Sequence, residues 1–333
     1  MKLQHLDSGK IVLRLTALWA LAESGLGGVL HLLHLPLSGI VLTGISVSIL
    51  TLIFYFSENK LLQMTEALIL VLIIKYSVSP HTSVTAAIAV AFQCLMAFAI
   101  YSIFSIRFIS VLLVCILTYL ESAFQKIFVL YILYGKNLAN LINEFVQKLS
   151  IDFFRIEGRT STESILLYYA SIYLLCSVIA SILVYKLYSK LIHADYKLFS
   201  KISISSIPIL DSENVNTKRK KTKFLVLLVL FLFIIIMAAV TQYKSVLYLL
   251  LRSVLLIAVW LFVILPVLKV LLFNFLKKKE HKYSQKLEEI KNLFPRIRNS
   301  VFYANQMVVT EFWYKKIFLL PYYILGVIIF SQE

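Results

Sequence analysis

Charged side chains are scarce in this sequence, and acidic ones are scarcer than basic ones. Only 15% of its 333 residues are Asp, Glu, Lys or Arg, whereas about a quarter is typical of soluble globular proteins. Hydrophobic residues make up 60% of the chain, which is more apolar surface than a soluble fold of this length can bury. The composition excludes an ordinary soluble domain. The repeated apolar runs of roughly 18 residues or more indicate membrane helices.

Cysteine is also scarce, and several catalytic motifs are missing. The three cysteines, Cys94, Cys115 and Cys176, all lie inside apolar runs and do not have the spacing of metal ligands or of a disulfide framework. No HExxH, P-loop or paired Asp-rich motif occurs. We therefore expect packing roles for the cysteines, no cofactor, and no enzyme activity of these types.

The apolar runs predict an all-α fold, a polytopic membrane helix bundle of about nine transmembrane helices. Each run is long enough to cross a hydrocarbon core, although the last is short and contains Pro321. The expected spans are residues 11–33, 36–56, 61–79, 83–104, 107–134, 165–187, 223–242, 246–275 and 316–331.

Basic residues gather in alternate loops of this map. The 33 Lys and Arg residues outnumber the 17 Asp and Glu residues, and the loops that carry the excess would all lie on one side of the membrane. The positive-inside rule then predicts a cytoplasmic N-terminus and an extracytoplasmic C-terminus. A net charge of +16 suggests nucleic acid in a soluble protein, but in these loops we expect anionic lipid as the partner and no nucleic acid.

A polar, Lys- and Ser-rich stretch at 191–222 divides the chain. We expect residues 1–190 to form a six-helix membrane domain, 191–222 a cytoplasmic basic linker, and 223–333 a three-helix membrane module. Within that module, residues 277–315 have the apolar spacing of an amphipathic helix that either lies on anionic lipid or docks a cytoplasmic protein. The apolar residues are Leu287, Ile290, Leu293, Phe294 and Ile297.

Three polar side chains of the first domain are expected at mid-membrane depth. Glu23, Gln93 and Glu121 each stand eleven to fourteen residues from an end of their helix (Ile11, Phe104 and Arg107), which gives similar depths at about 1.5 Å of rise per residue. Ionisable groups inside a bilayer are costly and therefore candidate functional residues. They either face one interior cavity or make satisfied contacts between helices.

A second polar group is expected near the outer face, and it comprises His31, His34, Lys75 and His81. Lys75 either extends toward the interface or faces a pocket and meets an anion or a carboxylate. His31 and His34 are three residues apart and share a helical face. That spacing permits one metal ion, but no third ligand is clear, so a metal remains unassigned.

Glycines are clustered directly after Glu23. The segment Ser24-Gly25-Leu26-Gly27-Gly28 holds three of the chain's nine glycines. Such clusters allow close packing of membrane helices or local unwinding of the backbone beside a cavity. Gly27 and Gly28 are therefore candidate substrate-binding positions, with tight helix packing as the simpler interpretation.

Several short motifs between residues 11 and 187 together resemble one family of membrane proteins. They are Ala17-Leu18-Trp19-Ala20, Glu23, Gly27-Gly28, Leu30-His31, Leu35-Pro36, Ser38-Gly39, Lys75, Ser79-Pro80-His81, Ala87-Ile88-Ala89-Val90 and Gln93. With these motifs the first half of the chain resembles substrate-binding (S) components of energy-coupling factor transporters. The resemblance implies six helices, a pocket for a vitamin-like molecule or a cation near the outer face, and cytoplasmic ABC-type ATPases as partners. The second half is only loosely similar to a membrane coupling (T) component and lacks an Ala-Arg-Gly motif.

The sequence thus predicts a multi-pass transport protein of the bacterial cytoplasmic membrane that binds a small-molecule solute. Two alternatives remain. A membrane enzyme acting on a lipid or an isoprenoid carrier would bring Glu23, Glu121, His31 and His81 to a groove open to lipid. A non-catalytic assembly subunit would use its polar residues only to join helices.

Overall fold

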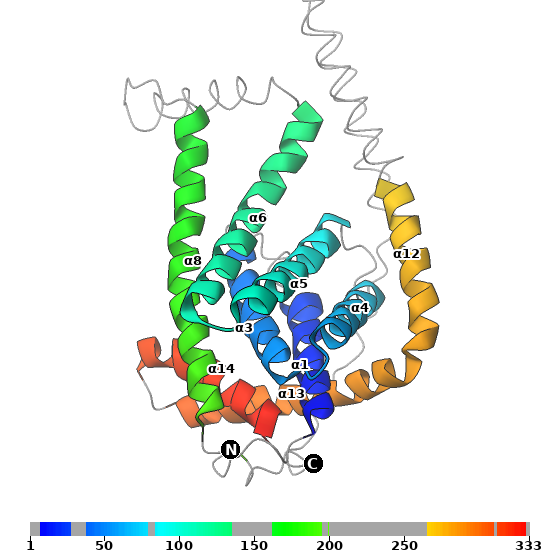
Figure 1. Ribbon diagram of the computed structural model, residues 1–333, viewed down its shortest axis with the longest axis vertical. Helices are drawn as coiled ribbons and strands as arrows, with labels where there is room; N and C mark the ends of the chain where they lie inside the picture. The colour runs from blue at the N-terminus through cyan, green and yellow to red at the C-terminus, as the bar shows by residue number, and fades with distance from the viewer. Residues whose placement is uncertain are drawn as a thin grey trace, which may run out of the picture.

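Every regular element that the computed structural model describes is a helix (Figure 1). The described residues are 7–27, 38–78, 84–134, 162–194, 199, 265–309 and 312–330. The prediction of an all-α fold is confirmed for these ranges. The elements are α1 (Ser8–Leu21), a π-helical segment η1 (Ala22–Leu26), α3 (Ser38–Phe56), α4 (Lys60–Val78), α5 (Val84–Phe104), α6 (Phe108–Tyr134), α8 (Thr162–Ile192), α12 (Leu265–Lys282), α13 (Ser284–Val308) and α14 (Trp313–Phe330).

Five of these helices, α3, α4, α5, α6 and α8, are long and apolar enough to cross a membrane. Their bounds lie within a few residues of the predicted second to sixth spans, because uninterrupted apolar runs fix helix length. The molecule is therefore a multi-pass helical membrane protein. The predicted span 223–242, and most of the one at 246–275, lie outside the described residues.

The last helix, α14, differs from the predicted ninth span. Its apolar part, Phe318–Phe330, is shorter than the roughly 20 residues that a crossing requires. It lies across the end of the bundle (Figure 1) and packs on α13, α8 and α1. Arg14 Nη1 on α1 donates to the carbonyl of Ile328 at 3.4 Å, so the end of α14 lies beside the first half of α1. The described residues do not support a ninth crossing.

Helix α3 is the centre of the bundle and contacts α1, α5, α6 and α8. Two glycines on α3 let α6 approach closely. A Cβ at Gly44 would lie 2.8 Å from Tyr119 Oη, and a Cβ at Gly39 would overlap Ser122 Oγ. This close packing fixes the register of α6 against α3.

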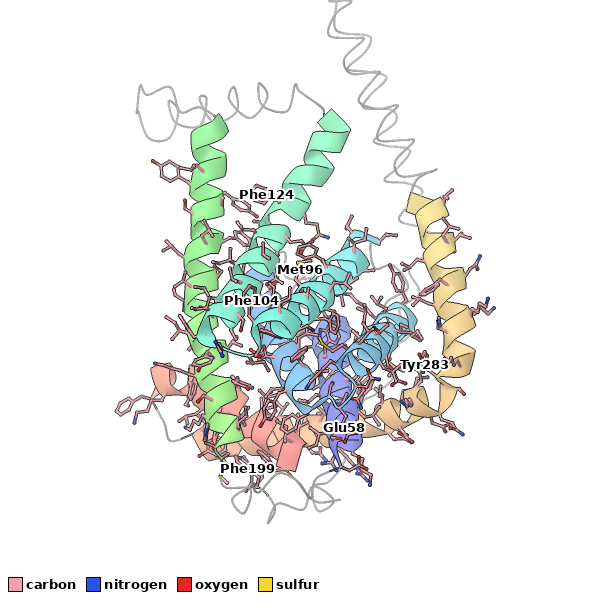
Figure 2. The ribbon with its side chains drawn as sticks, viewed as in Figure 1. Glu58, Met96, Phe104, Phe124, Phe199 and Tyr283 are labelled. Carbon is pink, nitrogen blue, oxygen red and sulfur yellow. The ribbon has the colours of Figure 1, made fainter. Side chains whose placement is uncertain are left out.

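The turns that carry basic residues meet at one end of the bundle. Ser8 Oγ, at the start of α1, donates to Glu58 in the α3–α4 turn. The rings of Phe108 and Tyr185 lie 5.7 Å apart, which brings the α5–α6 turn to the end of α8. Figure 2 shows Glu58 at the same end as α13. The basic residues gathered there include Lys10, Lys60, Arg107, Lys186, Lys190 and the lysines that follow Phe275.

Helix α13 lies within the segment predicted to be amphipathic. Leu287, Ile290 and Ile297 are buried, and the helix runs across the basic end of the bundle (Figure 1). An ion pair of 2.6 Å between Lys286 Nζ and Glu66 joins α13 to α4. The second half of the chain is thus packed against the first, although the division into 1–190, 191–222 and 223–333 stays a prediction.

Candidate functional site

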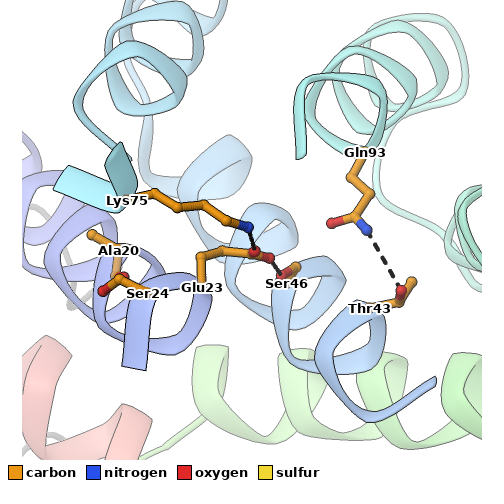
Figure 3. A network of polar contacts seen from close by, with 7 residues as sticks. All are labelled: Ala20, Glu23, Ser24, Thr43, Ser46, Lys75 and Gln93. Atoms are coloured by element: carbon orange, nitrogen blue, oxygen red, sulfur yellow. Dashed lines mark hydrogen bonds and ion pairs between the residues drawn. The ribbon is translucent and has the colours of Figure 1, made fainter. Parts of the chain in front are cut away.

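A buried ion pair joins η1 to α4. Lys75 Nζ donates to Glu23 Oε2 at 2.6 Å, and Ser46 Oγ on α3 donates to Glu23 Oε1 at 2.7 Å (Figure 3). Glu23 is 2% exposed and Lys75 is 6% exposed. Of the alternatives open for Lys75, the structure shows the one in which it turns inward and meets a carboxylate.

Glu23 owes its position to a π-helical segment. Residues Ala22–Leu26 form a wider turn than the α-helix that precedes them, and such π-turns occur frequently at functional sites. Ser24 Oγ donates to the carbonyl of Ala20 at 2.6 Å. The backbone of the described part of the glycine segment stays helical: it forms this π-turn, and Gly27 keeps helical backbone angles, φ −56° and ψ −44°.

The ion pair is costly to assemble and costly to break. Removing two charges from water requires several kcal/mol per ion in typical proteins, which mutual attraction and further hydrogen bonds must offset. Glu23 accepts two hydrogen bonds, whereas the Lys75 ammonium, with three N–H groups, has one acceptor among the described residues. The pair has no net charge, which makes its burial within the bundle tolerable.

Gln93 of α5 lies next to this pair. Gln93 Nε2 is 3.5 Å from Thr43 Oγ1, and Thr43 is three residues before Ser46 on α3. Residues three apart share a helical face, with Cβ atoms about 5–6 Å from each other. The contacts of α3 with Gln93 and with Glu23 therefore occur on one face, about one turn apart.

Glu121 of α6 lies at a similar height along α3. Its neighbours Ser122 and Tyr119 pack at Gly39 and Gly44, so Glu121 lies at the level of this stretch of α3, although at 3.6 residues per turn its side chain leaves α6 on a different side from theirs. Residues 39–46 rise by roughly 10 Å. The structure thus places Glu23, Gln93 and Glu121 in one layer, as their helix positions predicted.

Four side-chain polar atoms in the described part of the chain are buried without a hydrogen-bond partner. Two belong to this layer, Gln93 Oε1 and Glu121 Oε2. The other two, Trp19 Nε1 and Tyr76 Oη, belong to residues close in sequence to Glu23 and Lys75. Unpaired buried polar atoms typically cost about 1–3 kcal/mol each, so this layer is less completely paired than an ordinary helix interface.

The remaining predicted residues, Gly28, His31, His34 and His81, lie outside the described residues. Among the residues that the structure describes, no group of three or more His, Cys, Asp and Glu side chains could hold a metal ion. Ser46 and Thr43 were not predicted, because isolated hydroxyl residues in an apolar helix are common. Their spacing of three, next to Gly44, is the signal that could have identified them.

A cavity of about 250 Å³ lies apart from this layer, between α1, α4 and α13. Its lining mixes both signs of charge and includes Asp7, Lys10, Glu66, Lys286 and Glu289. None of the residues of the buried layer lines it. The cavity belongs to the contact between α13 and the first half of the chain.

The fold and this layer define a class, a multi-pass helical membrane protein with a buried, charge-paired polar layer centred on α3. No protein-family model matches the chain, and no match was found among curated proteins or among solved structures. A more specific assignment therefore depends on the chemistry of the layer.

Proposed function

We propose that the chain is a membrane transport protein whose N-terminal bundle binds a small solute, and that it is not an enzyme. The solute site is the layer around Glu23, Lys75, Gln93 and Glu121. The resemblance to substrate-binding components of energy-coupling factor transporters agrees with this proposal, and so does the position of the layer in the half of the bundle away from the basic end.

One observation carries the proposal: the buried Glu23–Lys75 pair is held by a π-turn, while acceptors in the same layer stay unpaired. A subunit that uses polar residues only to join helices is expected to pair them fully, because each unpaired group destabilises the bundle. Acceptors without partners are instead expected where a ligand supplies the missing donors. This difference favours a binding layer over the assembly-subunit alternative.

The proposal includes an orientation. The positive-inside rule assigns the basic end to the cytoplasm, which puts α13 and α14 on the cytoplasmic face in contact with anionic headgroups. The crossings predicted at 223–242 and 246–275, in a bacterial cytoplasmic membrane, also belong to this proposal, and so do ABC-type ATPase partners docking near α13; a crossing by α14 does not.

The orientation predicts a labelling pattern in intact cells. In a Cys176→Ser background, whose two remaining cysteines, Cys94 and Cys115, are buried, one new cysteine at a time replaces Asn59 in the α3–α4 turn, Gln306 on α13 or Thr82 between α4 and α5. A membrane-impermeant maleimide should label only the Thr82→Cys protein in intact cells, and should label the other two after the cells are opened. Labelling of Asn59→Cys or Gln306→Cys in intact cells would contradict the orientation.

The solute is sought by native mass spectrometry of the full chain, extracted gently from the membrane of its own host. We expect a bound small molecule on the wild-type protein and at least about tenfold lower occupancy after Glu23→Gln, since a hydrogen bond involving a charged group contributes roughly 1.5–3 kcal/mol. Glu66→Gln, which alters the exposed pair with Lys286, is the matched control and should keep the molecule.

A wild-type protein that carries only phospholipid, in repeated preparations, would contradict solute binding and favour the assembly-subunit alternative. A lipid or isoprenoid carrier retained in a Glu23-dependent manner would instead favour the membrane enzyme.

A further inference from the structure

We infer that the solute group bound in this layer is a cation with N–H donors, of the ammonium or amidinium type, and that Glu121 and Gln93 hold it. This inference rests on the proposed function and specifies its substrate class. It follows from the charges of the layer, from its unpaired acceptors and from the register of α5 and α6.

The charge balance of the layer is negative when Glu121 is ionised. Glu23 and Lys75 neutralise each other at 2.6 Å. Glu121 forms no hydrogen bond or ion pair with any residue in the described part of the chain, and its Oε2 atom is buried. An uncompensated carboxylate inside the bilayer is strongly unfavourable. A bound cation removes that imbalance, whereas a bound anion increases it.

The unpaired groups of α5 and α6 are both acceptors. Gln93 is 5% exposed, and its amide nitrogen is directed at Thr43. Figure 3 shows that its Oε1 is turned away from Thr43, where it has no partner among the described residues. Together with Glu121 Oε2, this carbonyl presents two acceptors that N–H donors of a ligand can satisfy.

The hairpin of α5 and α6 brings these two acceptors to the same level. The helices pack together on either side of the turn at 105–107, and Gln93 and Glu121 stand twelve and fourteen residues from its ends. At about 1.5 Å of rise per residue, their heights above the turn differ by roughly 3 Å. Gln93 contacts α3 at Thr43, and the neighbours of Glu121 contact α3 at Gly39 and Gly44. Both residues therefore lie at the level of the same segment of α3.

The test uses three probes of nearly identical size and shape that differ in charge: benzamidinium, benzamide and benzoate. Each is titrated into the full chain in lipid nanodiscs, and its dissociation constant is measured by calorimetry, with the thermal unfolding midpoint as a second readout. We expect benzamidinium to bind and to raise the midpoint, benzamide to bind at least about tenfold more weakly, and benzoate to have no effect.

Two variants locate the site. Glu121→Gln keeps the size of the side chain and removes its charge, so it should weaken benzamidinium by about tenfold or more. Gln93→Met removes the second acceptor at similar volume and should also weaken benzamidinium binding. This second variant keeps the test valid if the Glu121→Gln protein does not fold. Glu66→Gln, far from the layer at the basic end, should bind benzamidinium like the wild type.

The inference is overturned if benzamidinium does not bind, if benzoate binds as well or better, or if neither variant weakens benzamidinium. These failures differ from failure of the proposed function. If benzoate or benzamide binds and its binding depends on Glu23, a solute site exists, but the inference that its ligand is a cation is wrong. If the protein binds none of the probes and carries no co-purified small molecule, the transport proposal itself is wrong.

Discussion

Replacing Glu23 by alanine is expected to destabilise the protein by about 3–5 kcal/mol, because it leaves the Lys75 ammonium buried without its counter-charge. Lys75 is 6% exposed and has one acceptor among the described residues, Glu23 Oε2. Ser46 loses its acceptor as well. The free energy of unfolding, measured by titration with SDS in mixed micelles, reports the loss.

The double variant Glu23→Leu/Lys75→Met separates charge imbalance from loss of packing. It removes both charges at similar volume, so its stability should lie within about 1–2 kcal/mol of the wild type, well above that of Glu23→Ala. The matched control is Glu66→Ala, which breaks the pair with Lys286; the Lys286 side chain is 48% exposed and that of Glu66 is 16% exposed. An exposed pair contributes about 0–1 kcal/mol. Equal losses for Glu23→Ala and Glu66→Ala would contradict the assigned burial of the Glu23–Lys75 pair.

The helix map could be predicted well because it depends on chain-local properties. Apolar runs set the ends of α3, α4, α5 and α6, and distance from a helix end set the shared depth of Glu23, Gln93 and Glu121. The apolar periodicity of 287–297 predicted α13. None of these inferences requires knowledge of which helices are neighbours.

The contacts that these side chains make depend on how each helix is rotated about its axis and on which helices it packs against. Depth in the membrane determines neither. Lys75 was predicted to belong with the histidines near the outer face, about 7 Å below the interface. In the structure its long side chain reaches inward to Glu23, whose own direction is set by a π-turn that shifts the helical phase. Ser46 was missed for the same reason, since its role appears only when α3 packs between α1 and α6.

Helix α14 shows that hydrophobicity alone does not decide whether a helix crosses the membrane. Hydrophobicity predicted a crossing at 316–331, but the apolar segment is short and begins after Lys315 and Lys316. Contacts with aromatic rings then fix the position of α14. Lys190 of α8 lies 4.3 Å from the centroid of the Tyr322 ring. Phe199, from the stretch predicted as a linker, stacks on Phe330 at 5.9 Å. These contacts join segments far apart in sequence, which no local pattern reveals.

Replacing Gly326 by alanine is expected to destabilise the protein, although glycine-to-alanine changes inside helices usually stabilise by about 1 kcal/mol. A Cβ at Gly326 would lie 2.5 Å from two atoms of the Phe199 ring. That ring is 2% exposed and is held among Tyr322, Tyr323 and Phe330, so it cannot move aside cheaply. Overpacking of this kind costs about 1–3 kcal/mol, enough to exceed the gain in helix propensity.

Gly25→Ala is the matched control for this effect, because an added Cβ there meets nothing within 4 Å and should be neutral or stabilising. In the double variant Phe199→Ala/Gly326→Ala, the second substitution should no longer destabilise, since the ring that it would strike is absent. A double-mutant cycle of unfolding free energies should therefore give a coupling of about 1–3 kcal/mol between positions 199 and 326. Additive effects would show that Phe199 does not occupy the space above Gly326, and the anchoring of this residue on α14 would then be wrong.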